Sequence, residues 1–341
     1  MPSLSNTVAA KAKQPSSSSS GRALTGFTSG WRILLLLTLL LASIGLFLGW
    51  NVKASWAFTL EYRGYKLLTL LIVGAAVSIA TLLFQTITAN RILTPGIMGF
   101  DSMYILIQTL LIFLLGSVGF ATISPYFKWA LESAVMLGAV MILTSILFRG
   151  TARSLHYLIL VGIILGVLFN SLAYLFIRLL DPTQFSVLQD SMFASFGSIE
   201  PSLLLISGLV FLLAIVVLYR LHSELDVMLL GRNSALNLGV NFSQRTFLVL
   251  ALTAILIALS TALVGPISFF GLLVVHLTYR LCGSYKHRVM LPFAAILGML
   301  TLVFGEFLLQ HIFQFNTRLS IIIEFIGGTF FLLLIIKQGK A

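Results

Sequence analysis

The sequence has little charge and almost no cysteine. Of its 341 residues, 9% are Asp, Glu, Lys or Arg and 59% are apolar, whereas a soluble globular protein is roughly 25% charged and about half apolar. This composition argues against a soluble enzyme, a disordered chain and a secreted disulfide scaffold. Cys282 is the only cysteine, so neither an intrachain disulfide nor a thiolate metal cluster is expected. The sequence also lacks a GxxxxGK[ST] phosphate loop and a GxGxxG turn, which excludes the usual P-loop nucleotide hydrolysis.

What the sequence does contain is a series of long apolar segments. A helix of about 20 mostly apolar residues crosses the hydrocarbon core of a bilayer. We therefore predict an all-α polytopic membrane protein with about ten transmembrane helices. The predicted spans are 32–50, 66–88, 97–116, 130–148, 156–179, 202–219, 246–264, 268–283, 289–310 and 319–336. The window 268–283 is the shortest, and it opens beside Gly265-Pro266.

The distribution of positive charge predicts the topology. Residues 1–30 are expected to form a disordered N-terminal tail that includes a Ser-rich stretch, and residues 31–341 to form one ten-span domain. In the ten-span arrangement, 15 of the 21 Lys and Arg residues fall on one side and 6 on the other. Positive residues are retained in the cytoplasm, so both termini are predicted to be cytoplasmic. The net charge of +11 is accordingly attributed to topology, and no nucleic-acid partner is expected.

Acidic side chains inside apolar segments are candidates for function, because a charge in the bilayer is costly unless it is paired or hydrated. Glu132, Glu306 and Glu324 lie inside predicted spans, and Asp101 lies near an interface. One interpretation is an ion-coupled secondary transporter that uses Glu306 and Glu324, and the other is structural contacts within the helix bundle. The Gly265-Pro266 break has no adjacent carboxylate, which favours the structural interpretation. The five histidines have no metal-ligand spacing, so no metal site is predicted.

The polar segment 220–245 lies on the predicted cytoplasmic side. Its apolar residues fall near helical spacing, and Gly231 and Gly239 are suited to end short helices. We expect a pair of short amphipathic helices here. Such helices either lie along the membrane surface or form a docking surface that transmits force from a soluble partner. The residue pattern leaves these two interpretations open.

Four blocks of sequence resemble, in order, motifs of the permease family of ABC importers for iron–siderophores, haem and vitamin B12. They are VGAAVSIATLLFQTITANRILTPGIMG (73–99), LLGRNSALNLGVN (229–241), VGPISFFGLLVVHLTYRLCGSYKHR (264–288) and EFIGGTFFLLLI (324–335). The similarity extends from about residue 30 onward. Arg91, Val275 and Thr329 stand where the family usually has proline. The variant NRILTP is similar to the branch that serves ferric siderophores, often catecholates.

The resemblance implies the fold, the function and the partners. It implies a fold like that of the vitamin B12 importer permease and a subunit that moves ferric siderophore into the cytoplasm without catalysing a reaction. The implied partners are separate ABC ATPase subunits, a second permease subunit (homologous or identical) and an extracytoplasmic siderophore-binding protein. The implied location is the bacterial cytoplasmic (inner) membrane, in contact with lipid, and no cofactor is implied. An ion-coupled secondary transporter remains the alternative.

The resemblance also assigns the coupling of ATP hydrolysis to the segment 229–241. In the family this stretch is seated in a cleft of the ATPase. The residues expected to make that contact are Leu230, Gly231, Ala235, Leu238 and Gly239.

Docking and path residues follow from the same resemblance. Arg63 and Lys66 match paired basic residues that meet acidic residues of the binding protein, and Arg318 lies in the region of another such contact. The alternative for Arg63 and Lys66 is that they anchor the second span among lipid headgroups. The second and fifth spans line the translocation path in relatives, so Gln85 and Asn170 are the expected polar path residues.

Overall fold

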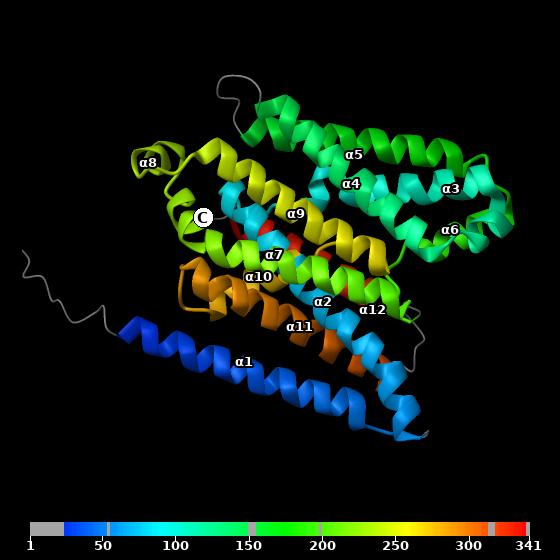
Figure 1. Ribbon diagram of the computed structural model, residues 1–341, viewed down its shortest axis with the longest axis horizontal. Helices are drawn as coiled ribbons and strands as arrows, with labels where there is room; N and C mark the ends of the chain where they lie inside the picture. Colours follow the sequence, from blue (N-terminus) through cyan, green and yellow to red (C-terminus); the bar gives the residue numbers. More distant parts are fainter. Residues whose placement is uncertain (1–23, 53–54, 149–154, 198–199, 313–317, 339–341) are drawn as a thin grey trace, which may run out of the picture.

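The computed structural model describes residues 24–52, 55–148, 155–197, 200–312 and 318–338. Within these ranges the regular secondary structure is entirely helical, which confirms the predicted all-α class. The helices run roughly parallel to one long direction of the molecule, with α1 and α5 on opposite sides of the bundle (Figure 1).

The described chain forms twelve α-helices and one 3-10 helix, and each of the ten predicted spans overlaps one of the longer helices. The elements are α1 (Leu24–Gly49), α2 (Trp56–Thr88), η1 (Pro95–Met98), α3 (Phe100–Thr122), α4 (Pro125–Phe148), α5 (Leu155–Ile177), α6 (Pro182–Ser191), α7 (Pro201–Met228), α8 (Arg232–Asn237), α9 (Phe242–Val264), α10 (Phe270–Leu281), α11 (His287–His311) and α12 (Leu319–Gln338). Of the helices described, eight are long and apolar enough to cross a membrane, and α10 and α12 contribute shorter apolar stretches.

The start of the first helix differs from the expected boundary. Helix α1 begins at Leu24, inside the segment 1–30 that the sequence analysis assigned to the tail. The rest of that segment, residues 1–23, lies outside the described residues.

Helix α10, which lies in the predicted span 268–283, is too short to cross the membrane by itself. Its 12 residues extend for only about 18 Å at 1.5 Å per residue, which is less than the roughly 30 Å of the hydrocarbon core. Non-helical backbone precedes it, with Gly265 at φ +99° and Phe269 at φ +58°. Gly265 and Pro266 are buried, and non-helical backbone is tolerated at membrane depth where protein surrounds it.

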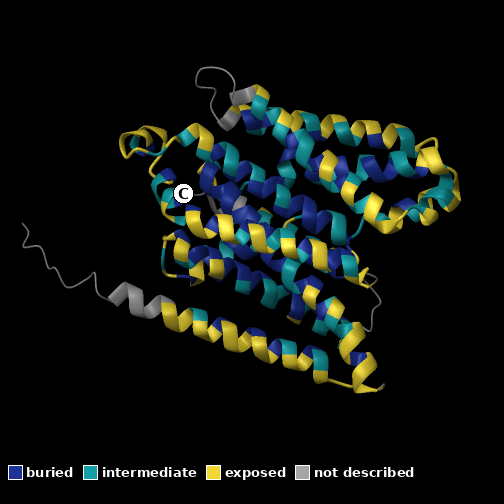
Figure 2. Ribbon diagram, viewed as in Figure 1, coloured by how far each residue is buried: buried dark blue, intermediate teal, exposed yellow. Residues whose placement is uncertain are grey.

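Helix α2 is the centre of the bundle. Every residue from Val73 to Ile87 is buried, and α2 packs against α1, α7, α9, α10 and α11. Figure 2 shows this buried helix passing between more exposed neighbours. Small side chains make the close packing possible: a Cβ atom on Gly74 would lie 2.8 Å from the carbonyl oxygen of Gly298 on α11.

Candidate functional site

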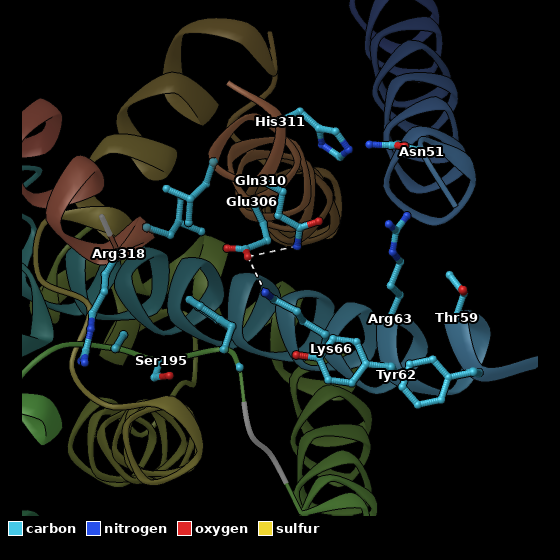
Figure 3. Close-up of a pocket in the computed structure, with 16 residues that line it drawn as sticks. Asn51, Thr59, Tyr62, Arg63, Lys66, Ser195, Glu306, Gln310, His311 and Arg318 are labelled. Carbon is cyan, nitrogen blue, oxygen red and sulfur yellow. Dashed lines mark hydrogen bonds and ion pairs between the residues drawn. The ribbon is translucent and has the colours of Figure 1, made fainter. Parts of the chain in front are cut away.

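A cavity of about 720 Å³ lies at the end of the bundle where α2 begins (Figure 3). Arg63 and Lys66 of α2 line it together with Arg318, which lies just before α12. The chain therefore brings three basic side chains to one cavity, although Arg318 is far from the other two in sequence. We call this space the basic cavity.

Lys66 is paired with an acidic residue inside the basic cavity. Its Nζ atom lies 2.5 Å from Oε1 of Glu306 on α11, and the two side chains are 10% and 3% exposed. Gln310 donates a further hydrogen bond of 3.3 Å from Nε2 to the same carboxylate oxygen. The ammonium of Lys66 thus points to Glu306, which does not support the headgroup-anchor alternative for this residue.

Arg63 caps the end of helix α1. Its Nη1 atom donates to the carbonyl oxygens of Phe47 at 2.9 Å, Leu48 at 3.2 Å and Trp50 at 3.0 Å. The last carbonyls of a helix lack partners within the helix, and they attract positive charge. Arg63 therefore fixes α1 to α2 and lines the basic cavity at the same time.

Arg318 is held by helix α6. Its Nη2 atom lies 2.6 Å from Oδ1 of Asp190, and its Nη1 atom donates to the carbonyl oxygen of Asp190 at 2.6 Å. Asp190 is exposed, so this pair contributes only about 0–1 kcal/mol to stability and can exchange partners easily. In Figure 3 the pair Lys66–Glu306 lies between Arg318 and Arg63.

Two aromatic residues that the sequence pattern did not single out also line the basic cavity. Phe58 and Tyr62 line it, are exposed, and stack with ring centroids 6.3 Å apart. Exposed aromatic side chains beside arginine are typical of protein–protein contact sites. The available signal was their i, i+4 spacing on the same helix as Arg63, which places them on one face.

The predicted coupling segment lies at the opposite end of the bundle, where α8 projects beyond α7 and α9 (Figure 1). The expected pair of short helices is wrong in one respect: α7 continues to Met228, so only α8 is a separate short helix. Gly231 has φ +89° and Gly239 has φ +82°, as expected for residues that end helices. Both conformations would be strained for a residue with a side chain.

Helix α8 and the residues on either side of it expose apolar side chains around a buried residue. Ala235 is fully buried, whereas Leu230 and Leu238 are 63% and 62% exposed. Leu229 and Leu236 are exposed as well. Adjacent exposed leucines on a protruding segment are suited to a protein contact.

The two predicted path residues make contacts within the chain. Gln85 is 2% exposed, and its Nε2 atom donates to the carbonyl oxygen of Leu93 at 3.2 Å. Asn170 of α5 is partly buried and donates from Nδ2 to Oγ of Ser102 on α3 at 2.8 Å. Gln85 therefore holds the segment after α2, and it has almost no surface for a passing solute in this conformation.

The other three acidic residues that the sequence placed in or near apolar spans each have a polar partner or are partly exposed. Glu132 is buried and accepts a hydrogen bond of 2.6 Å from Gln108, and Asp101 accepts one of 3.0 Å from Ser268. Glu324 is partly exposed. Among the residues that the structure describes, no three His, Cys, Asp or Glu side chains are grouped to hold a metal ion.

The sequence pattern of the FecCD transport family matches residues 23–337. The chain belongs to the FecCD transport family. It is therefore a multi-pass membrane permease of the bacterial inner membrane, and it is a transport subunit rather than an enzyme. Membership implies ATPase partners and a second permease subunit.

Two relatives of this FecCD chain are permeases. Over 310 residues it is 41% identical to the petrobactin import system permease protein YclO of Bacillus subtilis (strain 168), covering 91% of this chain and 98% of that protein. Over 276 residues it is 33% identical to the petrobactin import system permease protein FatC of Bacillus anthracis, covering 81% and 78%.

The fold of the FecCD chain is similar to that of a solved transporter. A structure described as an inward-facing conformation of a metal-chelate type ABC transporter matches with a TM-score of 0.77 and 26% identity, over 91% of this chain and 99% of the other. These similarities do not favour the alternative of an ion-coupled transporter that uses Glu306 and Glu324. The pairing of Glu306 with Lys66 agrees with a structural role for that carboxylate.

Proposed function

We propose that this chain is the permease subunit of an ATP-driven importer of a ferric siderophore, with petrobactin as the first candidate cargo. The observation that carries the proposal is the 41% identity to YclO over 98% of that permease. Because this chain has no phosphate loop, ATP hydrolysis belongs to separate ATPase subunits.

The orientation follows from the charge asymmetry of the sequence. With both termini in the cytoplasm, α8 faces the cytoplasm and the basic cavity faces the outside. The exposed apolar side chains along α1 and α5 then face membrane lipid or the second permease subunit, which is identical or homologous.

The basic cavity is the proposed docking site for an extracytoplasmic siderophore-binding protein. Acidic side chains on that protein would be steered toward Arg63, Lys66 and Arg318 by long-range attraction. Arg318 is the residue most ready to change partners, because its pair with Asp190 is exposed. Phe58 and Tyr62 add apolar area at the same site.

The segment 229–241 is the proposed contact with the ATPase. Leu230 and Leu238 offer exposed apolar surface, and Gly231 and Gly239 set the backbone on either side of α8. Ala235, which is buried, anchors the helix to the bundle. ATP binding would displace this segment and bias the permease pair between outward-open and inward-open states.

The proposed path lies between the two permease subunits, since a ferric siderophore is much larger than a bare ion. Asn170 on α5 is the proposed polar residue of that path. Gln85 would contribute only in a state in which the end of α2 has opened.

The proposal is tested by uptake of radiolabelled ferric petrobactin in cells that express this chain with its ATPase and binding-protein partners. Uptake should continue when the proton gradient is collapsed and stop when ATP is depleted. A ferric hydroxamate competitor tests the cargo, because it should leave petrobactin uptake unchanged. Accumulation of the chelate by vesicles that contain this chain alone would contradict the proposal.

A further inference from the structure

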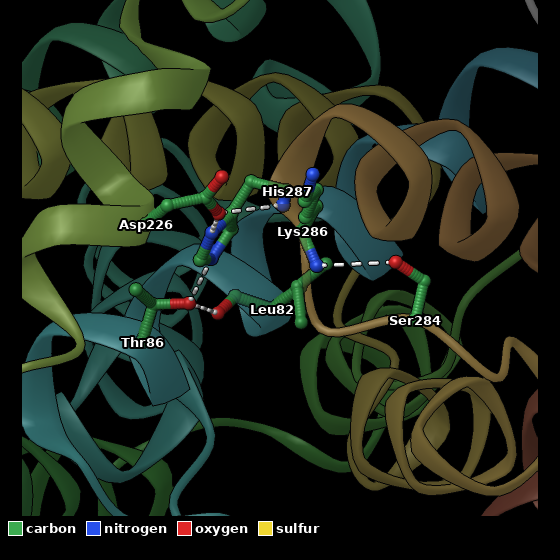
Figure 4. A network of polar contacts seen from close by, with 6 residues as sticks. All are labelled: Leu82, Thr86, Asp226, Ser284, Lys286 and His287. Carbon is green, nitrogen blue, oxygen red and sulfur yellow. Dashed lines mark hydrogen bonds and ion pairs between the residues drawn. The ribbon is translucent and has the colours of Figure 1, made fainter. Parts of the chain in front are cut away.

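Three helices meet in a polar network close to α8, with His287 at its buried centre (Figure 4). Asp226 of α7 accepts a hydrogen bond of 2.7 Å from the backbone N–H of His287, the first residue of α11. The same Oδ1 atom lies 2.6 Å from Nδ1 of His287. On its other side, Nε2 of His287 lies 2.8 Å from Oγ1 of Thr86 on α2. His287 is 1% exposed and its contact with Thr86 is buried, whereas the side chain of Asp226 is 34% exposed.

The network has a defined direction of hydrogen bonding. A carboxylate only accepts, so the Nδ1–H group of His287 donates to Asp226. The hydroxyl of Thr86 also bonds the carbonyl oxygen of Leu82 at 2.8 Å. A hydroxyl has one hydrogen, and that of Thr86 is donated to Leu82. The hydroxyl oxygen can therefore only accept from His287, which requires that Nε2 also carries a proton. A network of this kind fixes the relative positions of three helix ends more narrowly than apolar packing does.

All three residues of the network lie at or near the end of a helix, so the network can transmit movement between those ends. Asp226 is two residues from the end of α7, and α8 begins four residues after that end. Thr86 is two residues from the end of α2. A displacement of α8 therefore reaches the end of the central helix through two short contacts.

The end of α2 is hydrogen-bonded to the segment that follows it. Gln85, the neighbour of Thr86, donates to the carbonyl oxygen of Leu93, and η1 begins two residues later. Arg91 in this segment lies over the ring of Tyr279 on α10, 4.6 Å from its centroid. Movement of the α2 end would thus reach η1 and the C-terminal part of helix α10.

We propose that Asp226, His287 and Thr86 are positioning residues that transmit displacement of the ATPase-docking segment to the end of α2. This inference rests on the proposed function, in which α8 receives the ATPase. None of the three residues is assigned a contact with cargo, ATP or partner.

The test uses the complete importer in vesicles, with ferric petrobactin uptake and ATP hydrolysis measured together. Thr86→Val removes the hydroxyl at nearly unchanged volume, and it should lower the number of siderophores imported per ATP by about tenfold. Thr86→Ser keeps the hydroxyl and should restore the ratio. Thr144→Val is the matched control, because Thr144 is also buried and its hydroxyl bonds only carbonyls of its own helix, Val140 at 2.6 Å and Met141 at 3.2 Å.

A distance measurement separates transmission from general packing. Spin labels on Asn90→Cys, just after α2, and Ile146→Cys on α4 report movement of the α2 end, in a background with Cys282→Ser. Both labelled positions are exposed. ATP should change this distance in the importer with an unsubstituted Thr86 and in Thr86→Ser, and the change should be absent in Thr86→Val.

Each outcome decides the inference. Normal import per ATP in Thr86→Val, or an equal loss in Thr144→Val, would overturn it. If Thr86→Val does not assemble, Asp226→Ala is measured instead, and unaltered coupling there would overturn the inference. Absence of ATP-dependent uptake by the unsubstituted importer would overturn the proposed function as well, whereas normal coupling in the variants overturns the positioning role alone.

Discussion

Lys66 and Glu306 form a buried ion pair of 2.5 Å that joins α2 to α11 in the basic cavity. Removing charges from water is costly, and the attraction between them repays that cost only while both are present. The pair thus explains how a basic residue near the start of the central helix and an acidic residue within α11 are both tolerated at low exposure.

Glu306→Leu should destabilise the protein by about 3 kcal/mol, because it leaves the Lys66 ammonium buried without its carboxylate. Lys66→Met combined with Glu306→Leu should recover most of that loss. Thermal unfolding in detergent measures both. A double variant no more stable than Glu306→Leu alone would show that the ion pair is not the cause.

Arg318→Ala should weaken the binding protein's affinity about tenfold, which corresponds to about 1.4 kcal/mol, and mainly at low salt. Asp190→Ala should leave affinity unchanged or raise it, since it releases the Arg318 guanidinium from its partner. Titration of the binding protein against the importer at two salt concentrations tests both. Arg178→Ala is the control, because Arg178 is exposed on the same side and is not among the residues of the basic cavity. An equal loss in Arg178→Ala would argue for a general effect of charge.

Leu238→Asp should abolish co-purification of the ATPase while the permease itself folds normally, because this side chain is 62% exposed. Tyr285→Asp is the matched control, as Tyr285 is exposed in the loop between α10 and α11, outside the segment 229–241. Retention of the ATPase by Leu238→Asp would contradict docking at α8.

Gly74→Ala should destabilise the bundle by about 1–3 kcal/mol through overpacking. Its new methyl group would meet the backbone of Gly298, which cannot move aside as a side chain can. Gly138→Ala on α4 should have no such effect, because a Cβ atom there has nothing within 4 Å. Equal unfolding temperatures for the two variants would refute a close α2–α11 crossing at Gly74.

Several features of the fold could be predicted from the sequence, because they depend on short-range patterns. The length of each apolar segment predicted the ten longer helices, and Gly265-Pro266 marked the break before the short helix α10. Gly231 and Gly239 were expected to end helices, and both have positive φ. The prediction of a second short helix in 220–245 was wrong. An apolar pattern does not show where a helix ends, and α7 continues to Met228.

The contacts between helices were decided only by the tertiary structure. The sequence indicated Arg63 and Lys66 as a pair and Arg318 as a second contact of the same kind. It did not indicate that the end of α1, Glu306 and Asp190 hold these side chains at one cavity. It showed His287 as one of five histidines without metal spacing, and not as the link between α7 and α2. The physical reason is that hydropathy and helix length are properties of one segment and its solvent. Which faces of two helices meet depends on the fit of small residues and polar partners from distant parts of the chain.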